Sequence, residues 1–126
     1  MPSEVLLASR QENIAILRLN RPEQRNALNT ELRNAIREAL TEIENDDSLS
    51  VAIVTGNGWV FCAGFDLKEL QSIGMATVLA GESSQRYHET LRNFRKPLIA
   101  AVNGAAMAGG FDVAALSDIR VASTNA

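Results

Sequence analysis

The sequence contains a single cysteine, Cys62, and a single histidine, His88, among its 126 residues. One cysteine excludes a disulfide within the chain and a zinc site built from several cysteines. It is also consistent with a reducing compartment. One histidine excludes a histidine-rich metal site. Because His88 falls on an expected surface helix, we predict an exposed side chain rather than a general base. Cys62 is predicted to be a small packed residue rather than a nucleophile.

The sequence also lacks long apolar runs and a strong excess of one charge. No stretch approaches the roughly 20 apolar residues of a membrane span, and the N-terminus lacks the basic and apolar regions of a signal peptide. A net charge of -3 argues against a nucleic-acid surface. We therefore expect a cytoplasmic protein, or one of an organelle matrix, that binds neither nucleic acid nor membrane.

Strand and helix patterns alternate along the chain. An apolar stripe with helical spacing follows Asn29, a good N-cap, and comprises Leu32, Ala35, Ile36, Ala39, Leu40 and Ile43. Strands are predicted at 4–9, 13–19, 51–55, 98–102 and 118–122, and further helices at 66–72, 83–95 and 112–116. Residues 72–81 fit no pattern clearly. The first two strands form a predicted hairpin through residues 10–12, and the strand–helix–strand order that follows requires a parallel sheet.

Two stretches share one layout, in which an apolar strand leads through small residues into a helix. The first ends in Ala-Gly-Phe-Asp at 63–66 and the second in Gly-Gly-Phe-Asp at 109–112. The strand at 98–102 is wholly apolar, which predicts burial on both faces. Two such turns side by side would present backbone N–H groups to one negative oxygen, as an oxyanion hole does. The alternative is a pair of ordinary strand-to-helix turns whose small residues serve packing.

Several common nucleotide and nucleophile motifs are absent. The glycines at 104–110 lack the Lys-Ser/Thr of a P-loop and the spacing of the dinucleotide fingerprint. No Gly-x-Ser-x-Gly elbow is present.

Arg18, Arg21 and Arg25 form a loose basic group around one loop, which we interpret as solvated surface. Trp59 and Phe61 are predicted to lie in the core or in a pocket wall.

Three segments together resemble the crotonase, or enoyl-CoA hydratase/isomerase, superfamily. The segments are Arg21-Pro22-Glu23 with residues 25–29, Phe61 to Leu67, and the stretch from Lys96-Pro97 through Asn103-Gly104 and Gly109-Gly110 to residues 117–123. The resemblance covers essentially the whole chain. It implies an α/β fold, a spiral of ββα units with a parallel central sheet flanked by helices, and an acyl-CoA thioester substrate. It also implies assembly as a homotrimer or hexamer.

The resemblance also implies roles for individual residues. The backbone N–H groups of Phe65 and Gly109 would hold the thioester oxygen, and Asp112 would act as general acid/base. The family's contacts to CoA or acyl group fall on Arg25, Ala27, Ala63, Asp66, Leu67 and Met107. No metal or redox cofactor is implied, because coenzyme A arrives with the substrate. For Asp112, the alternative is a helix N-cap.

The chain departs from the family pattern in two ways. The hydratases usually carry glutamate where this sequence has Asp112, whereas dienoyl-CoA isomerases carry aspartate. The chain is also about half a typical member, so we expect one domain over 1–126 that is incomplete at its C-terminus, with a second acid beyond Ala126. The expected function is enoyl-CoA hydration. The alternatives are double-bond isomerisation and a non-catalytic acyl-CoA-binding role.

Overall fold

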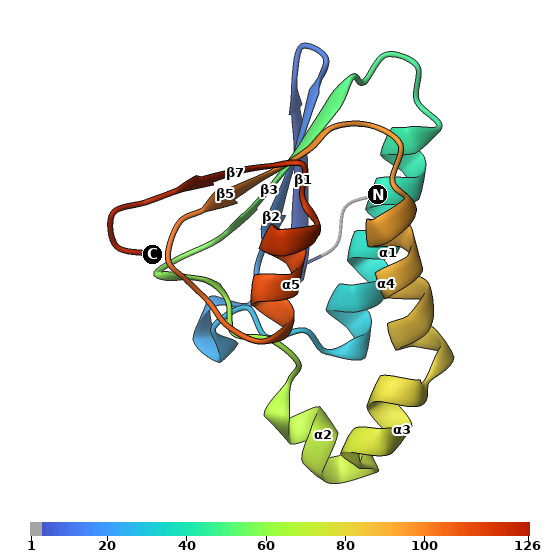
Figure 1. Ribbon diagram of the computed structural model, residues 1–126, viewed down its shortest axis with the longest axis vertical. Helices are drawn as coiled ribbons and strands as arrows, with labels where there is room; N and C mark the ends of the chain where they lie inside the picture. The colour runs from blue at the N-terminus through green and yellow to red at the C-terminus, as the bar shows by residue number, and fades with distance from the viewer. Residues whose placement is uncertain (1–3) are drawn as a thin grey trace.

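The computed structural model describes residues 4–126, and its centre is a five-stranded sheet (Figure 1). The strand order is β1 (Leu6–Gln11), β2 (Ile14–Leu19), β3 (Val51–Gly56), β5 (Leu98–Val102) and β7 (Ile119–Ala122). The strands β1 and β2 pair antiparallel, and all other neighbours pair parallel. The predicted hairpin and parallel sheet are confirmed. The hairpin turn lies two residues later than expected, where Glu12 has a φ of 55°.

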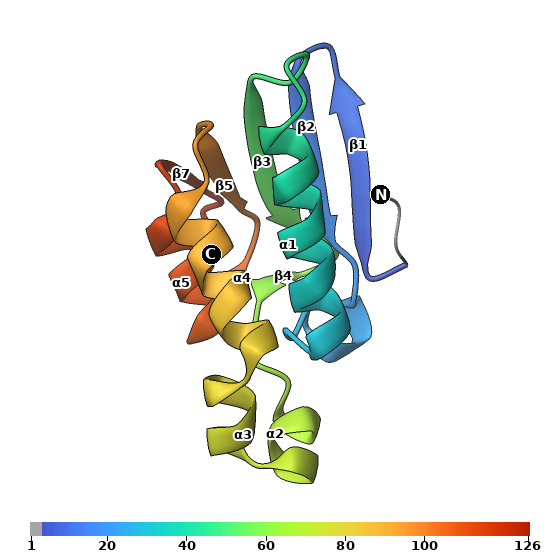
Figure 2. The same cartoon turned by 90° about the vertical axis from the view of Figure 1, so that its right-hand side faces the viewer.

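Three helices cover one face of this sheet: α1 (Thr30–Glu44), α4 (Glu82–Asn93) and α5 (Gly109–Leu116) (Figure 2). The stripe predicted on α1 faces the sheet, and the Asn29 side chain caps the helix by accepting the Leu32 N–H at 2.9 Å. Opposite it, Leu17, Val54 and Ala100 lie in register on three neighbouring strands and are all buried. Apolar burial between these layers forms the core.

The second face of the sheet corrects one prediction. The strand β5 alternates, with Leu98, Ala100 and Val102 buried and Ile99 and Ala101 only half-buried. The prediction of burial on both faces is therefore wrong for the described residues. The reason is that α1, α4 and α5 all lie against the same face. A continuous apolar run does not reveal which of its faces is covered.

A second, two-stranded sheet carries the chain from the main sheet to the helices. It pairs β4 (Val60–Cys62) with β6 (Ala105–Ala106) in parallel, directly after β3 and β5 respectively. Gly104 permits this close approach, because a Cβ there would lie 1.9 Å from the Trp59 carbonyl oxygen. The two strand-to-helix turns therefore lie side by side, which is the arrangement that the oxyanion-hole interpretation of the repeated layout requires.

The remaining helices form one end of the molecule. The helix α2 (Leu67–Ile73) lies one residue from its predicted position, and α3 (Met75–Ala80) occupies the stretch that fitted no pattern. A short 3-10 helix, η1, spans Pro22–Gln24. The helix α5 begins at Gly109, three residues earlier than predicted. Within residues 4–126, no helix is both long enough and apolar enough to cross a membrane.

Candidate oxyanion hole and proton-transfer site

The first predicted donor, the Phe65 N–H, follows the end of β4 and is left unpaired by its surroundings. Gly64 has a φ of 99°, a conformation that favours glycine. Leu28 brackets the turn, since its N–H donates to the Gly64 carbonyl at 2.7 Å and its carbonyl accepts the Asp66 N–H at 3.2 Å. These two bonds fix the backbone on both sides of Phe65. The Phe65 N–H itself donates to no described residue.

The second predicted donor is the Gly109 N–H, in the first turn of α5. An N–H at this position has no acceptor within its own helix. Ala108, just before it, has a φ of 49° and a ψ of -117°, a sparsely populated conformation of the kind found at functional sites. The turn is tied to β4, because the Met107 N–H donates to the Cys62 carbonyl at 3.0 Å. A Cβ on Gly64 would lie 3.2 Å from the Gly109 nitrogen, so the two turns nearly touch.

Both donors line one cavity of about 620 Å³. Its polar groups include the Asp112 carboxyl and the His88 ring, and its apolar wall contains Leu70, Met75, Leu79, Ala106, Ala108 and Phe111. All three residues predicted to be catalytic, Phe65, Gly109 and Asp112, therefore meet at this cavity. Asp112 is exposed, and the N-cap of α5 is Ala108. The alternative interpretation of Asp112 as a helix N-cap is therefore wrong.

His88 corrects the prediction of an exposed side chain. It is half-buried on α4, and its ring lies 6.0 Å from the Phe65 ring, nearly parallel to it at 10°. Its Nδ1 lies 2.8 Å from the Ser84 carbonyl oxygen. A carbonyl oxygen only accepts, so Nδ1 carries a proton. The sequence shows that His88 follows the core residue Tyr87, but it does not show that Phe65 packs beside it.

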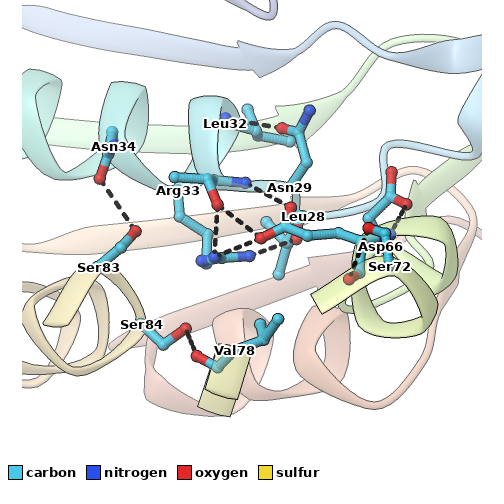
Figure 3. Close-up of polar contacts among 12 residues, drawn as sticks. Leu28, Asn29, Leu32, Arg33, Asn34, Asp66, Ser72, Val78, Ser83 and Ser84 are labelled. Carbon is cyan, nitrogen blue, oxygen red and sulfur yellow. Dashed lines mark hydrogen bonds and ion pairs between the residues drawn. The ribbon is translucent and has the colours of Figure 1, made fainter. Parts of the chain in front are cut away.

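Arg33 is the centre of a buried polar network that the sequence did not reveal, and Figure 3 draws its contacts with neighbouring residues such as Leu28. Arg33, on α1, is 2% exposed and places its guanidinium 4.8 Å from the Phe65 ring centroid. It donates to the Leu28 carbonyl at 2.7 Å and pairs with Glu69 at 3.0 Å. Burial raises the pKa of the Glu69 carboxyl, but hydrogen bonds from Thr30 and Arg33 outweigh it and leave the pKa lowered. The same arginine therefore holds both the Phe65 ring and the carbonyl that brackets its turn.

Side-chain hydrogen bonds also connect the helices that carry the cavity wall (Figure 3). The Ser84 hydroxyl donates to the Val78 carbonyl at 2.5 Å and joins α4 to α3. The Ser83 hydroxyl donates to the Asn34 side chain at 3.1 Å and joins α4 to α1. These contacts fix the helix that carries His88 relative to both neighbours.

The six residues predicted to contact CoA or acyl group lie outside the cavity lining, in segments next to the donors. These residues differ in solvent exposure. Ala27 and Asp66 are buried and Ala63 is half-buried, whereas Arg25 is exposed, Leu67 is 74% exposed and Met107 is 56% exposed. The Ala63 N–H donates to the Arg25 carbonyl at 3.1 Å, which brings those two together. Their contacts with a substrate stay predictions.

Asp66 has a structural role that the sequence did not reveal. Its carboxylate caps α2 by accepting the Glu69 N–H at 3.1 Å, and it pairs with Arg21 at 2.9 Å. Burial raises the pKa of the Asp66 carboxyl. These hydrogen bonds and the arginine charge outweigh burial, so the pKa lies below its ordinary value. Arg21 is thus partly buried and paired, and its interpretation as solvated surface is wrong.

Comparison with known proteins identifies the family. The family model described as Enoyl-CoA hydratase/isomerase matches residues 9–126. The chain belongs to the enoyl-CoA hydratase/isomerase family. It is 43% identical over 121 residues to the 2,3-dehydroadipyl-CoA hydratase of Escherichia coli (strain K12). This alignment covers 96% of this chain and 47% of that protein. It is 35% identical to the crotonyl-CoA hydratase of Syntrophomonas wolfei, over 100% of this chain and 49% of that one.

Solved structures of family members share the fold. The enoyl-CoA hydratase from Bacillus anthracis superposes with a TM-score of 0.89 at 30% identity, over 97% of this chain and 48% of that chain. The crotonase fold predicted from the sequence is confirmed. This family member spans about half the length of the curated relatives it matches. In residues 4–126, no three histidine, cysteine, aspartate or glutamate side chains are placed to share a metal ion.

Proposed function

We propose that the protein adds water to a 2-enoyl-CoA thioester. The observation that carries this proposal is the meeting of two unpaired N–H groups, from Phe65 and Gly109, with the Asp112 carboxyl at one cavity. Relatives named as 2,3-dehydroadipyl-CoA and crotonyl-CoA hydratases support the same reaction. The apolar wall suits an acyl chain.

The chemistry follows from where charge develops. When water attacks the β-carbon, the electron pair of the double bond moves toward the thioester oxygen. Two N–H groups aimed at that oxygen stabilise the resulting enolate, each by about 3 kcal/mol. Asp112, as a carboxylate, accepts the proton that the attacking water loses. The α-carbon then needs a proton from a second group.

The length of the Asp112 side chain bears on the choice between hydration and the alternative, double-bond isomerisation. Aspartate is one methylene shorter than the usual hydratase glutamate, a difference of about 1.5 Å. A carboxyl placed for an α-carbon proton rather than for water would favour isomerisation. A panel of enoyl- and dienoyl-CoA thioesters separates the two reactions by their products, a hydroxyacyl-CoA or a shifted double bond.

Further proposals concern the partners. Adding water to the double bond causes no net oxidation or reduction of the substrate or of the protein. We therefore propose that no cofactor is needed beyond the coenzyme A of the substrate. A homotrimer or hexamer is supported by exposed apolar side chains on α5 and β7, namely Phe111, Leu116, Ile119 and Val121. Light scattering at several concentrations tests this assembly. A cytoplasmic location stays a prediction.

The experiment that tests the function replaces Asp112. We expect Asp112→Ala to lower kcat for crotonyl-CoA hydration by about 10²- to 10⁴-fold and to leave the affinity for butyryl-CoA, measured by calorimetry, nearly unchanged. Asp47→Asn, a change at an exposed aspartate after α1, is the matched control. No turnover by the unmutated protein on the thioester panel would contradict the enzyme proposal and leave acyl-CoA binding alone. Equal activity in the variant would contradict only the role of Asp112.

A further inference from the structure

We propose that Arg33 is a positioning residue for the oxyanion hole, and that its guanidinium fixes the direction of the Phe65 N–H. The inference rests on the proposed function. Arg33 is 2% exposed and is not among the residues that line the cavity. It can therefore affect a bound thioester only through the groups that it holds. Two of these groups, the Leu28 carbonyl and the Phe65 ring, adjoin the Phe65 N–H.

The burial of the Arg33 charge is not explained by stability. Moving a guanidinium out of water is costly, and a buried ion pair is often no more stabilising than apolar side chains of similar volume. The Arg33 Nε, moreover, is buried and has no hydrogen-bond partner among residues 4–126, so part of the desolvation cost is not offset. An apolar side chain would fill this space at lower cost, but it could not donate hydrogen bonds to chosen acceptors.

The first contact of Arg33 fixes the backbone beside the Phe65 N–H. The Gly64 carbonyl and the Phe65 N–H belong to one planar peptide group and point in opposite directions. The Leu28 N–H holds that peptide group by donating to the Gly64 carbonyl at 2.7 Å. The Leu28 carbonyl in turn accepts Nη1 of Arg33 at 2.7 Å and the Asp66 N–H at 3.2 Å. A charged donor makes the stronger of such bonds, so Arg33 holds the residue that sets the direction of the Phe65 N–H.

The second contact of Arg33 holds the Phe65 side chain. The guanidinium carbon lies 4.8 Å from the centroid of the Phe65 ring, inside the range of about 6 Å over which a cation is attracted to an aromatic face. The attraction is stronger for a desolvated cation than at an exposed site. The same ring lies beside the other proposed donor, since a Cβ on Gly109 would be 3.1 Å from Cδ1 of Phe65. Holding the ring therefore also constrains the spacing of the two donor turns.

Glu69 and Thr30 orient the guanidinium. Nη2 of Arg33 donates to the Glu69 carboxylate at 3.0 Å and to the Thr30 hydroxyl at 3.1 Å, and the Thr30 N–H donates to Glu69 at 2.8 Å. The guanidinium is planar and its donors keep a fixed geometry. With Nη2 on this pair, Nη1 is therefore directed at the Leu28 carbonyl. The alternative is that Arg33 only fastens α2, which carries Glu69, to α1.

The carbonyl stretch of a bound thioester reports on the oxyanion hole, because hydrogen bonds to the oxygen weaken the C=O bond and lower its stretching frequency. The probe is butyryl-CoA, a saturated thioester that cannot be hydrated, with ¹³C at its carbonyl carbon for isotope-edited infrared spectroscopy. We expect binding to the unmutated protein to lower the frequency, and Arg33→Met to lose at least half of that lowering. A frequency in Arg33→Met equal to that in the parent would overturn this inference and leave the proposed function standing. No lowering in the parent would overturn both.

The control variant is Thr30→Ala, which tests the fastening of α2 by itself. It removes the hydroxyl that joins Arg33 to Glu69 but leaves the bond from Arg33 to the Leu28 carbonyl. We expect Thr30→Ala to lower the urea midpoint slightly and to keep the full lowering of the carbonyl frequency. A loss as large as that of Arg33→Met would show that Arg33 only fastens α2, and would overturn its positioning role.

A double variant guards against loss of the fold. Arg33→Met alone leaves the Glu69 carboxylate, 15% exposed, without its cation, whereas Arg33→Met with Glu69→Gln leaves no lone charge. We expect the double variant to unfold cooperatively in urea, yet to lose the carbonyl shift and about 10²-fold in kcat for crotonyl-CoA hydration. KM should be nearly unchanged, because a misdirected N–H matters most when charge develops on the oxygen. A folded double variant with the carbonyl frequency and kcat of the parent would overturn the inference.

Discussion

Replacing Gly109 or Gly110, the first two residues of α5, with alanine should change the free energy of unfolding by very different amounts. A Cβ at Gly110 would lie 2.1 Å from the Cys62 carbonyl oxygen and 2.7 Å from its carbon, which are backbone atoms of β4. A Cβ at Gly109 would meet only the ends of side chains, Phe65 at 3.1 Å and Leu28 at 3.3 Å. Backbone of a paired strand cannot move aside as a ring or a leucine methyl can. We therefore predict that Gly110→Ala is severely destabilising and Gly109→Ala is not.

The magnitudes follow from these distances. For Gly110→Ala, relieving contacts below 3.0 Å requires α5 to shift away from β4, and such overpacking costs about 3 kcal/mol. For Gly109→Ala, small side-chain shifts are offset by a gain of about 0.4–1 kcal/mol, because alanine leaves the unfolded chain with less conformational entropy than glycine. Its free energy of unfolding should thus stay within about 1 kcal/mol of the parent. The Phe65 ring must still yield, so butyryl-CoA affinity should fall even though the Gly109 N–H remains.

Urea unfolding followed by circular dichroism measures both free energies, and calorimetry measures the affinity. The slope against urea must stay constant for the comparison to hold. If Gly110→Ala unfolds within about 1 kcal/mol of the parent, the close approach of α5 to β4 is wrong. If Gly109→Ala binds butyryl-CoA as the parent does, the Phe65 ring does not constrain the site.

Three further predictions concern buried polar groups. Tyr87→Phe should raise the free energy of unfolding by about 1 kcal/mol, because the Tyr87 hydroxyl is buried without a partner among the described residues. Cys62 should resist iodoacetamide at about pH 8 until the protein unfolds, since burial raises the pKa of the thiol to about 11. Asp66→Asn should lower the urea midpoint at neutral pH, and the difference from the parent should shrink as pH falls below the ordinary pKa of 3.8. The reason is that the lowered pKa of Asp66 adds stability only while the carboxylate stays ionised.

Each of these has a result that would count against it. A less stable Tyr87→Phe would mean that the hydroxyl has a partner. Rapid labelling of Cys62 in the folded protein, judged by intact mass, would show that β4 opens readily. A difference between Asp66→Asn and the parent that persists unchanged at about pH 2 would show that the ion pair with Arg21 is not its cause.

Two residues show where sequence reasoning stops. Arg33 stands next to Leu32 in a helix whose apolar stripe is clear, and nothing in that spacing marks an arginine as 2% exposed. Its burial depends on Leu28, Thr30 and Glu69, and Glu69 comes from a helix 36 positions further along the chain. His88 is a similar case, because its place at the cavity depends on the Phe65 ring, which lies on a different element.

The sequence by itself determined the order of the five strands of the main sheet and of α1, α2, α4 and α5, together with the α1 stripe and its Asn29 cap, the parallel sheet and the family. These features follow from periodicity and from turn residues, which act over a few neighbouring positions. It also placed Phe65, Gly109 and Asp112 in related turns. Only the tertiary structure decided that both turns meet at one cavity, that His88 shares it, and that one face of the sheet is less covered. Those features depend on contacts between distant segments, and local pattern carries no information about which partner a given face meets.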